Sequence, residues 1–314
     1  MRSREVRHKA LGTLSAVIDL HCHSSCSDGT DPPERLARLA AEAELTAVAL
    51  TDHDTVAGFD AFDSACQQRG VRAIRAAEIS CLDEGRSMHV LCYFISDDEG
   101  SALRRLLATL SGDRDRRNVV LLERLASLGY DRVTIEEVRK SAGEETASIG
   151  RPHFANALLR LYPTEFTNLQ GVFDALLGSS GAAYVEKAHV TVAEASAAAR
   201  ADGAVTAMAH PLITLMADAR ADDRTLDTIE RRVEPVLERL VNDGLGGLES
   251  FYSRHDALEA QLLASLARRH GIVPTGGSDF HGTTKPDLAL GRGTGSLAVP
   301  DELLVELEAA RPRG

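Results

Sequence analysis

The sequence predicts an α/β fold in which a barrel of about seven strands is interrupted by a helical insertion. Three observations support this prediction: short segments rich in Val, Ile, Leu and Ala recur along the chain, amphipathic helical patterns separate most of them, and this alternation lapses in one long stretch. Strands that alternate with helices favour parallel pairing with the helices outside. With 314 residues, the chain can form one such barrel or two ordinary domains.

Seven segments have the composition of buried strands. They are residues 17–20, 46–50, 71–76, 88–94, 204–208, 245–249 and 272–275. Helical patterns such as PPERLARLAAEAEL, TIERRVEPVLERLVNDG and HDALEAQLLASLARRHG separate most of them. The segment EISCLDEGRSMHVLCYF differs, because its DEGR centre indicates a turn. We therefore expect a hairpin between Glu78 and His89.

Residues 99–189 form the stretch in which the alternation lapses. Successive helical patterns, among them SALRRLLATLSGDRDRRNVVLLERLASLGY and PHFANALLRLY, predict a helical insertion domain. The barrel is then discontinuous, with residues 17–98 before the insertion and 190–314 after it. Residues 1–16 carry positive charge without a long apolar stretch, which predicts a flexible N-terminal tail rather than a signal peptide.

Composition and charge limit the partners. The formal net charge of −12 argues against a surface that grips duplex DNA, because neutralising phosphates requires Lys and Arg. A small phosphorylated substrate remains compatible with it if bound cations reverse the sign locally. Five cysteines without CxxC spacing favour free thiols in a reducing compartment. No segment approaches the length of a membrane span, so we expect a cytoplasmic protein.

Residue types that bind metals follow strand after strand. In chain order, the predicted strand ends carry His21 and His23, then Asp52, His53 and Asp54, then Glu78, His89, His210, Glu249, and finally Asp279 and His281. The C-terminal ends of barrel strands share one face, so we expect these side chains to converge on one cleft. Histidines with carboxylates suit Zn, Mn or Fe rather than Ca or Mg. The candidates outnumber the ligands of one ion, which predicts two or three divalent metal ions.

These motifs resemble those of the PHP (polymerase and histidinol phosphatase) superfamily. The matching segments, in order from Val17 onward, are DLHCHSSCSDGT, LTDHDT, AEIS, MHVLCYF, AHP and GSDFHG. The resemblance implies a distorted (β/α)7 barrel with three metal positions. The first would be held by His21, His23, Glu78 and Asp279, the second by Glu78, His89 and His210, and the third, near the reacting phosphate, by Asp28, His53 and His281.

The insertion resembles the helical cap of stand-alone PHP phosphoesterases. That subgroup acts on nucleotide 3′,5′-bisphosphates or trims 5′-phosphorylated oligoribonucleotides from the 5′ end. The resemblance implies that the cap offers Arg117, Asn118, Arg151 and His153 to a phosphate or base. A solvated helix face is the alternative for Arg114, Arg116 and Arg117. A low aromatic content of 4% favours a mononucleotide or a short oligonucleotide end over a long strand.

The expected chemistry is in-line attack on phosphorus by a hydroxide that bridges two metals, without a covalent intermediate. Asp52 and Asp54 could orient His53. The nearest alternative is a small phosphomonoester phosphatase of the histidinol-phosphate type. An amidohydrolase acting on C–N bonds is a weaker alternative, since it usually needs eight strands and a carboxylated lysine, and no lysine ends a predicted strand. A non-catalytic module attached to a polymerase is disfavoured, because every ligand position is filled. The oligomeric state stays open.

Overall fold

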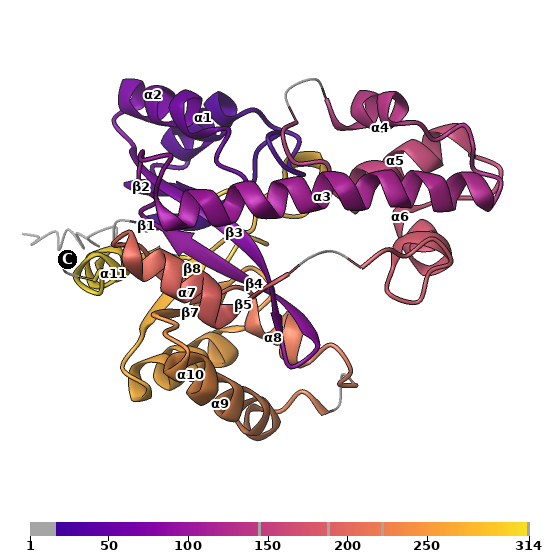
Figure 1. Ribbon diagram of the computed structural model, residues 1–314. Helices are drawn as coiled ribbons and strands as arrows, with labels where there is room; N and C mark the ends of the chain where they lie inside the picture. Colours follow the sequence, from indigo (N-terminus) through magenta and orange to yellow (C-terminus); the bar gives the residue numbers. More distant parts are fainter. Residues whose placement is uncertain (1–16, 144–145, 187–188, 221–222, 313–314) are drawn as a thin grey trace, which may run out of the picture.

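The computed structural model describes residues 17–143, 146–186, 189–220 and 223–312. The predicted N-terminal tail lies outside the described residues. Figure 1 shows a central sheet with helices around it and a group of helices projecting to one side. The main strands are β1 (Val17–Cys22), β2 (Ala47–Leu50), β3 (Arg72–Asp83), β4 (Arg86–Tyr93), β6 (Val205–Met208), β7 (Gly247–Tyr252) and β8 (Val273–Gly277). They confirm the seven predicted strands to within a few residues, except that β3 runs further than expected.

The strands form one nearly closed sheet in the order β8-β7-β6-β4-β3-β2-β1-β9. β1, β2 and β3 are parallel to one another, as are β6, β7 and β8, whereas β4 is antiparallel to both of its neighbours. Two strands of two residues each were not predicted: β5 (Val190–Thr191) pairs with β3, and β9 (Val299–Pro300) pairs with β1. Segments this short carry no periodic signal.

The predicted hairpin is confirmed as β3 and β4. Asp83 pairs with Arg86, and the two residues between them, Glu84 and Gly85, have φ values of 46° and 78°. Positive φ at both central residues is the geometry of a type I′ turn, whose twist matches that of the strands. The hairpin places Ser80 opposite His89, so that His89 comes to the same end of the sheet as Glu78.

A buried carboxylate closes the barrel between β1 and β8. The direct pairing there is the isolated bridge between Cys22 and Phe280. Asp19 supplements it: its Oδ1 accepts hydrogen bonds from the backbone N–H of Ser278 (2.8 Å) and of His21 (3.1 Å), and its Oδ2 accepts one from Gly291 (2.7 Å). The side chain is fully buried. One carboxylate thus holds three backbone segments at the seam.

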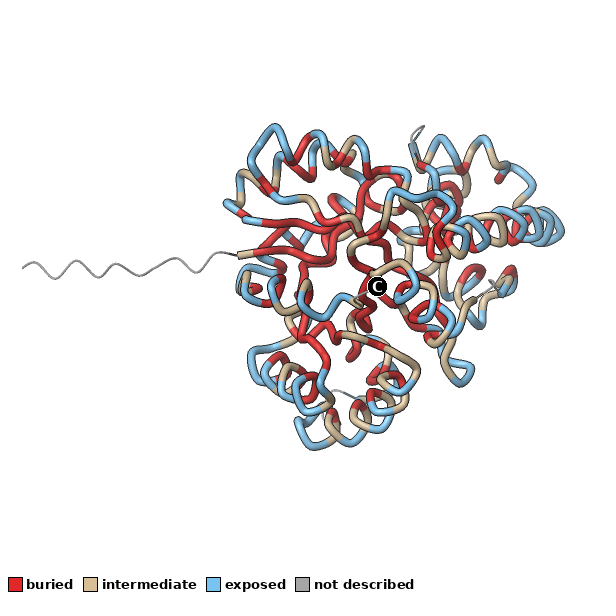
Figure 2. The backbone as a smooth tube through the Cα atoms, turned by 60° about the vertical axis from the view of Figure 1, so that its left-hand side comes forward, coloured by how far each residue is buried: buried red, intermediate tan, exposed pale blue. Residues whose placement is uncertain are grey.

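Helices cover the sheet and bury its outer face. They are α1 (Pro33–Glu42), α2 (Phe59–Arg69), α7 (Val192–Ala201), α8 (Pro211–Leu215), α9 (Leu226–Asn242), α10 (Ala257–Arg269) and α11 (Glu302–Ala309). One hydrophobic cluster joins strands to α1, α2, α7, α9 and α10, and a second joins strands to α11. Figure 2 shows burial concentrated in the central strands and exposure on the surrounding helices. No helix in the described part of the chain is both long and apolar enough to cross a membrane.

The projecting group comprises α3 (Ala102–Ser127), α4 (Ile135–Ala142), α5 (Arg151–Leu161), α6 (Leu169–Val172) and the π-helix η1 (Phe173–Leu177). It has a hydrophobic cluster of its own. The long helix α3 belongs to both parts: Leu103 and Leu107 lie in the barrel cluster, and Leu121 and Leu125 lie in the other. We call residues 102–183 the cap. The domain boundaries proposed from the sequence stay a prediction.

The seam carboxylate generates a stability prediction. Asp19→Ala leaves three buried N–H groups without an acceptor, and we expect it to lower the free energy of unfolding by about 3–5 kcal/mol. Asp19→Asn should cost less, because its amide oxygen still accepts. Urea unfolding followed by circular dichroism measures both. Asp60→Ala, at a fully exposed carboxylate on α2, is the control. An unfolding midpoint for Asp19→Ala equal to that of the control would contradict the role given to this residue.

Candidate metal centre

Glu78 is the centre of the candidate site. It lies within β3, only 1% of its surface is exposed, and its two carboxylate oxygens face five imidazoles. Oε1 lies 2.8 Å from His89 Nδ1 and 2.9 Å from His210 Nε2. Oε2 lies 3.2 Å from His21 Nε2, 3.0 Å from His23 Nε2 and 3.3 Å from His53 Nδ1. Burial alone would raise the pKa of Glu78, but the surrounding imidazoles outweigh it and hold that pKa well below its usual range.

A second anionic centre is formed by Asp28, in the loop after β1. Its Oδ1 lies 3.3 Å from His281 Nε2 and 3.8 Å from His23 Nδ1, and its Oδ2 lies 3.6 Å from His53 Nε2. His23 and His53 therefore direct one ring nitrogen toward Glu78 and the other toward Asp28. These two imidazoles link the two carboxylates.

Asp279 completes the cluster from the segment after β8. Its Oδ1 lies 3.3 Å from His281 Nδ1, 3.5 Å from His21 Nε2 and 3.6 Å from His23 Nε2. Its φ of 55° lies in the left-handed region, as does the φ of 29° of His210. Such backbone conformations in non-glycine residues are uncommon and gather at functional sites.

The donor atoms fit divalent metal ions. Three groups of nitrogen and oxygen donors lie within 4.8 Å of one another: His23, Asp28, His53 and His281; His21, His23 and Glu78; and His53, Glu78 and His89. Within them, the buried atom His23 Nδ1 has no hydrogen-bond partner among the described residues. Buried polar atoms without partners are rare, and ions are one explanation for them. Mixed imidazole and carboxylate donors suit first-row transition metals.

The structure brings together all nine residues that the sequence singled out as metal ligands. Their division among three ions stays a prediction. The expected division assigns His23 and His53 to one metal position each. In the structure, each of these two imidazoles lies near both carboxylates, Glu78 and Asp28.

Glu249 was noted at a strand end but given no role. It is fully buried; its Oε1 lies 2.8 Å from His21 Nδ1, and its Oε2 accepts a hydrogen bond from the backbone N–H of His210 at 2.6 Å. A carboxylate on the outer nitrogen of a ligating histidine fixes the ring orientation and raises its basicity. One side chain thus positions an imidazole on β1 and the strained backbone of His210.

Lys285 and Tyr252 were not predicted either. Lys285 Nζ lies 2.6 Å from Asp279 Oδ2, and the Tyr252 hydroxyl donates to the same oxygen at 2.8 Å. They hold one oxygen of Asp279 and leave the other facing the imidazoles. Neither residue stands at the end of a predicted strand beside other residues that bind metals. The sequence pattern therefore did not identify them as part of the site.

The two carboxylates beside His53 have other partners. Asp52 accepts hydrogen bonds from the Ser24 backbone (2.8 Å) and hydroxyl (2.6 Å) and from the Ser27 hydroxyl, so it fixes the loop that carries Asp28. Asp54 accepts from the backbone and hydroxyl of Ser80, each at 2.8 Å, and pairs with Arg114. That these carboxylates orient His53 stays a prediction.

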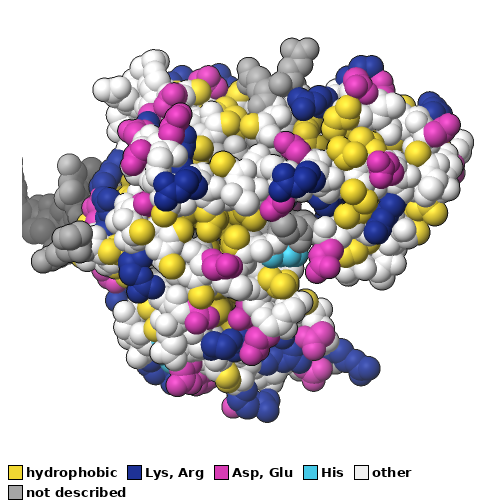
Figure 3. All heavy atoms as spheres, viewed as in Figure 1, with side chains coloured by type: hydrophobic (Ala, Val, Ile, Leu, Met, Phe, Trp, Pro, Cys, Tyr) yellow, Lys and Arg dark blue, Asp and Glu magenta, His cyan; other side chains and the backbone are white. Residues whose placement is uncertain are grey.

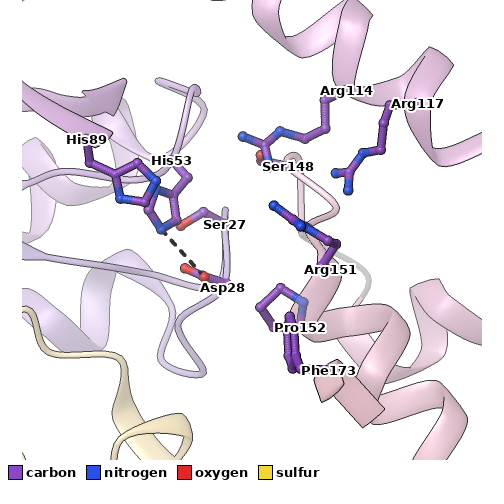
Figure 4. Close-up of a pocket in the computed structure, with 11 residues that line it drawn as sticks. Ser27, Asp28, His53, His89, Arg114, Arg117, Ser148, Arg151, Pro152 and Phe173 are labelled. Atoms are coloured by element: carbon purple, nitrogen blue, oxygen red, sulfur yellow. Dashed lines mark ion pairs between the residues drawn. The ribbon is translucent and has the colours of Figure 1, made fainter. Parts of the chain in front are cut away.

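A cavity of about 290 Å³ lies between the metal-type cluster and the cap. Asp28, His53 and His89 line it from the barrel, and Arg114, Arg117 and Arg151 line it from the cap. Figure 4 shows the guanidinium groups facing the Asp28 and His53 side chains across the space. The space-filling view shows the surface hollowed between the barrel and the projecting cap (Figure 3). The cavity therefore has one wall of metal-type ligands and one of cations.

The three cap arginines differ in their partners. Arg114 pairs with Asp54, and Arg151 donates to the Leu177 carbonyl at 3.2 Å. Arg117 is 5% exposed, yet its buried Nε and Nη1 have no hydrogen-bond partner among the described residues. Burial, together with the charges of Arg114 and Arg151, lowers the pKa of Arg117 to about 9. A cation held in this way is poised for an anion.

The solvated-face alternative is correct only for Arg116, which is exposed and pairs with Asp113. Asn118 and His153, expected to contact substrate, do not line the cavity. Asn118 Nδ2 donates to the Ile149 carbonyl at 3.0 Å. His153 Nδ1 accepts from the Gly150 N–H at 2.9 Å, and its ring also hydrogen-bonds the backbone of Ser27. Both side chains shape the loop before α5.

Glu249 generates a prediction about metal affinity. Glu249→Ala removes the partner of His21 Nδ1, and we expect it to weaken Mn²⁺ binding by about 10- to 100-fold. Glu249→Gln, which keeps one acceptor, should fall between this variant and the wild type. Calorimetric titration of metal-free protein measures the affinity. Glu238→Ala, at an exposed position on α9, should bind as the wild type does. Equal affinity in Glu249→Ala and wild type would contradict the positioning role.

Comparisons with known proteins agree with this geometry. The family model of the PHP domain matches residues 19–246. A phosphoribosyl 1,2-cyclic phosphate 1,2-diphosphodiesterase from Eggerthella lenta is 30% identical, with 85% of this chain and 94% of the relative covered. A 5′-3′ exoribonuclease from Haemophilus influenzae is 28% identical (85% and 91% covered), and a 3′,5′-nucleoside bisphosphate phosphatase from Chromobacterium violaceum is 28% identical (85% and 87% covered).

Two solved structures are similar over nearly their whole length. One, from Bifidobacterium adolescentis, is assigned as a metal-dependent phosphoesterase; it has a TM-score of 0.77 and 29% identity, with 94% of this chain and 96% of that chain covered. The other, from Chromobacterium violaceum, is named an amidohydrolase and contains bound sulfate; it has a TM-score of 0.74 and 26% identity, with 95% and 99% covered.

Proposed function

The chain belongs to the PHP domain family and is a phosphoester hydrolase, and we propose that it releases phosphate from nucleotide 3′,5′-bisphosphates or trims nucleotides from the 5′ end of short 5′-phosphorylated oligoribonucleotides. The observation that carries this proposal is the pair of opposed walls of the cavity. Metal-type ligands on the barrel suit the phosphate that reacts, and the cap arginines suit a second phosphate of the same molecule.

Two or three divalent ions, Mn, Fe or Zn, are the proposed cofactors. Such ions neutralise the oxygens of a phosphoryl group and lower the pKa of water so that hydroxide is available near neutral pH. Glu78 would be a shared ligand, because its two oxygens face separate sets of imidazoles. Asp28, His53 and His281 are the proposed ligands beside the reacting phosphate, since Asp28 and His53 line the cavity and His281 contacts Asp28.

Side chains of the cap would bind the part of the substrate that does not react. Arg117 and Arg151 would bind the non-reacting phosphate and so fix the distance from it to the reacting one. Arg114 would contribute its charge at the boundary between barrel and cap, because it lines the cavity while pairing with Asp54 of the barrel. This local cation cluster explains how a chain with a net charge of −12 accepts an anionic substrate.

The alternatives fit the cavity less well. A histidinol-phosphate type of substrate carries an ammonium group, which three arginines would repel. Hydrolysis of a C–N bond, suggested by the name of one similar structure, usually relies on a carboxylated lysine, and the described lysine nearest the cluster, Lys285, is paired with Asp279. Neither alternative uses the unpartnered charge of Arg117.

Hydrolysis of three substrates tests the proposal, measured as released phosphate and, for the oligoribonucleotide, as released mononucleotide. We expect protein reconstituted with Mn²⁺ or Zn²⁺ to act on adenosine 3′,5′-bisphosphate or a 5′-phosphorylated oligoribonucleotide and to leave histidinol phosphate largely intact. Removing the metal with a chelator should abolish hydrolysis, and adding it back should restore it. Inactivity of the reconstituted protein on both nucleotide substrates would refute the nucleotide assignment.

The cap arginines supply a second test. Arg117→Gln removes a buried cation, and we expect KM for adenosine 3′,5′-bisphosphate to rise by about 10- to 100-fold, the range for a charge-assisted hydrogen bond, with a much smaller change in kcat. The matched control is Arg116→Gln, one residue away on the same helix but exposed. Steady-state kinetics of both variants measure the difference. If both variants behaved alike, Arg117 would have no specific part in binding.

A further inference from the structure

We propose that Phe173, the first residue of η1, is a specificity-determining residue that contacts the nucleobase of the substrate. This inference rests on the proposed function and deepens it, because it separates substrates that carry a base from sugar phosphates that do not. The Phe173 ring would contact the flat face of the base beside the cap arginines.

The first support is the composition of the cavity. Its lining side chains belong to charged or polar residues except for those of Pro152 and Phe173, which lie next to each other on the cap side below Arg151 (Figure 4). Phe173 packs against the hydrophobic cluster of the cap but is only partly buried, and the rest of its surface lines the cavity. A sugar phosphate has no apolar face to place there, whereas a nucleobase does.

The second support is the element that carries the ring. Residues 173–177 form a π-helix, a rare conformation that is frequent at functional sites. The turn closes tightly: the Gly178 N–H donates to the Phe173 carbonyl at 2.7 Å, and a Cβ on Gly178 would lie 2.7 Å from that oxygen. At its other end, the Leu177 carbonyl accepts from Arg151. One short element therefore sets the positions of the apolar ring and of a phosphate-binding cation.

The third support is the surroundings of Arg151. Its guanidinium lies over the Tyr184 ring, 5.3 Å from the centroid, and so has an aromatic side chain behind it. Guanidinium planes and aromatic rings are the two kinds of surface on which proteins stack unpaired bases. Arg151 and Phe173 both line the cavity and provide one of each.

The size of the cavity limits what these surfaces can hold. A volume of about 290 Å³ and a single phenylalanine leave room for one base rather than a stacked series. This agrees with the scarcity of aromatic residues in the chain. The proposal is therefore contact with one base, adjacent to the phosphate held by the arginines.

The experiment compares adenosine 3′,5′-bisphosphate with a base-free analogue, 1-O-methylribose 3,5-bisphosphate. In Phe173→Leu, we expect KM for the nucleotide to rise by about 5- to 100-fold, the range for loss of one base–aromatic contact, with kcat within about twofold. KM for the base-free analogue should not change. Phe173→Tyr, which keeps an aromatic ring, should retain the nucleotide KM of the wild type.

Phe166→Leu is the matched control, because Phe166 lies in the same cap cluster without lining the cavity. It should leave both KM values unchanged, and thermal unfolding of all variants separates loss of folding from loss of binding. If Phe173→Leu altered KM for both substrates equally or for neither, the inference would be overturned while the proposed function stood. If the wild type hydrolysed no nucleotide substrate, both would fail together.

Discussion

The rest of the structure depends on the burial of one carboxylate, that of Glu78, among five imidazoles. A buried charge is costly unless it is paired, so β1, the loop after β2, β4 and the end of β6 must all reach it for the fold to be stable. Glu78 lies just beyond the point where β3 stops pairing with β2. From there, β3 continues as one strand of the hairpin with β4. β4 pairs with the opposite edge of β3, and on the first edge the segment after β2 still bridges to Glu78 through His53, so side chains reach Glu78 from both edges.

An outer layer of polar and charged side chains keeps this arrangement in register. Asp19 holds the seam between β1 and β8, and Glu249 holds His21 together with the strained backbone of His210. Lys285 and Tyr252 hold the outer oxygen of Asp279. Most of these contacts join segments that are distant in the chain, and those to His21 and Asp279 limit the rotation of side chains in the inner cluster. These contacts would hold the candidate ligands in position and so lower the entropic cost of binding an ion.

Much of the fold and inner cluster was predictable because the signals are local. Apolar runs that end in histidine or a carboxylate mark both the strand and the end at which the site forms, and the DEGR turn marks the hairpin. The outer layer was not predictable in this way. Glu249 hydrogen-bonds His21 and His210, which are far from it in sequence, and its sequence neighbours do not indicate which way its carboxylate points. The same holds for Asn118 and His153, whose side chains shape a loop although their neighbourhood suggested contact with substrate.

The cap shows why such contacts matter for activity. Arg116 and Arg117 are neighbours in an unbroken run of charged residues, yet successive residues on a helix face directions about 100° apart. The packing of α3 against both hydrophobic clusters decides which of them is buried at the cavity. Arg114, one turn of helix before Arg117, ties that packing to the barrel through Asp54, the residue after His53. This ion pair bridges the two cavity walls, and under the proposed function it would set the spacing of the two phosphates in the substrate.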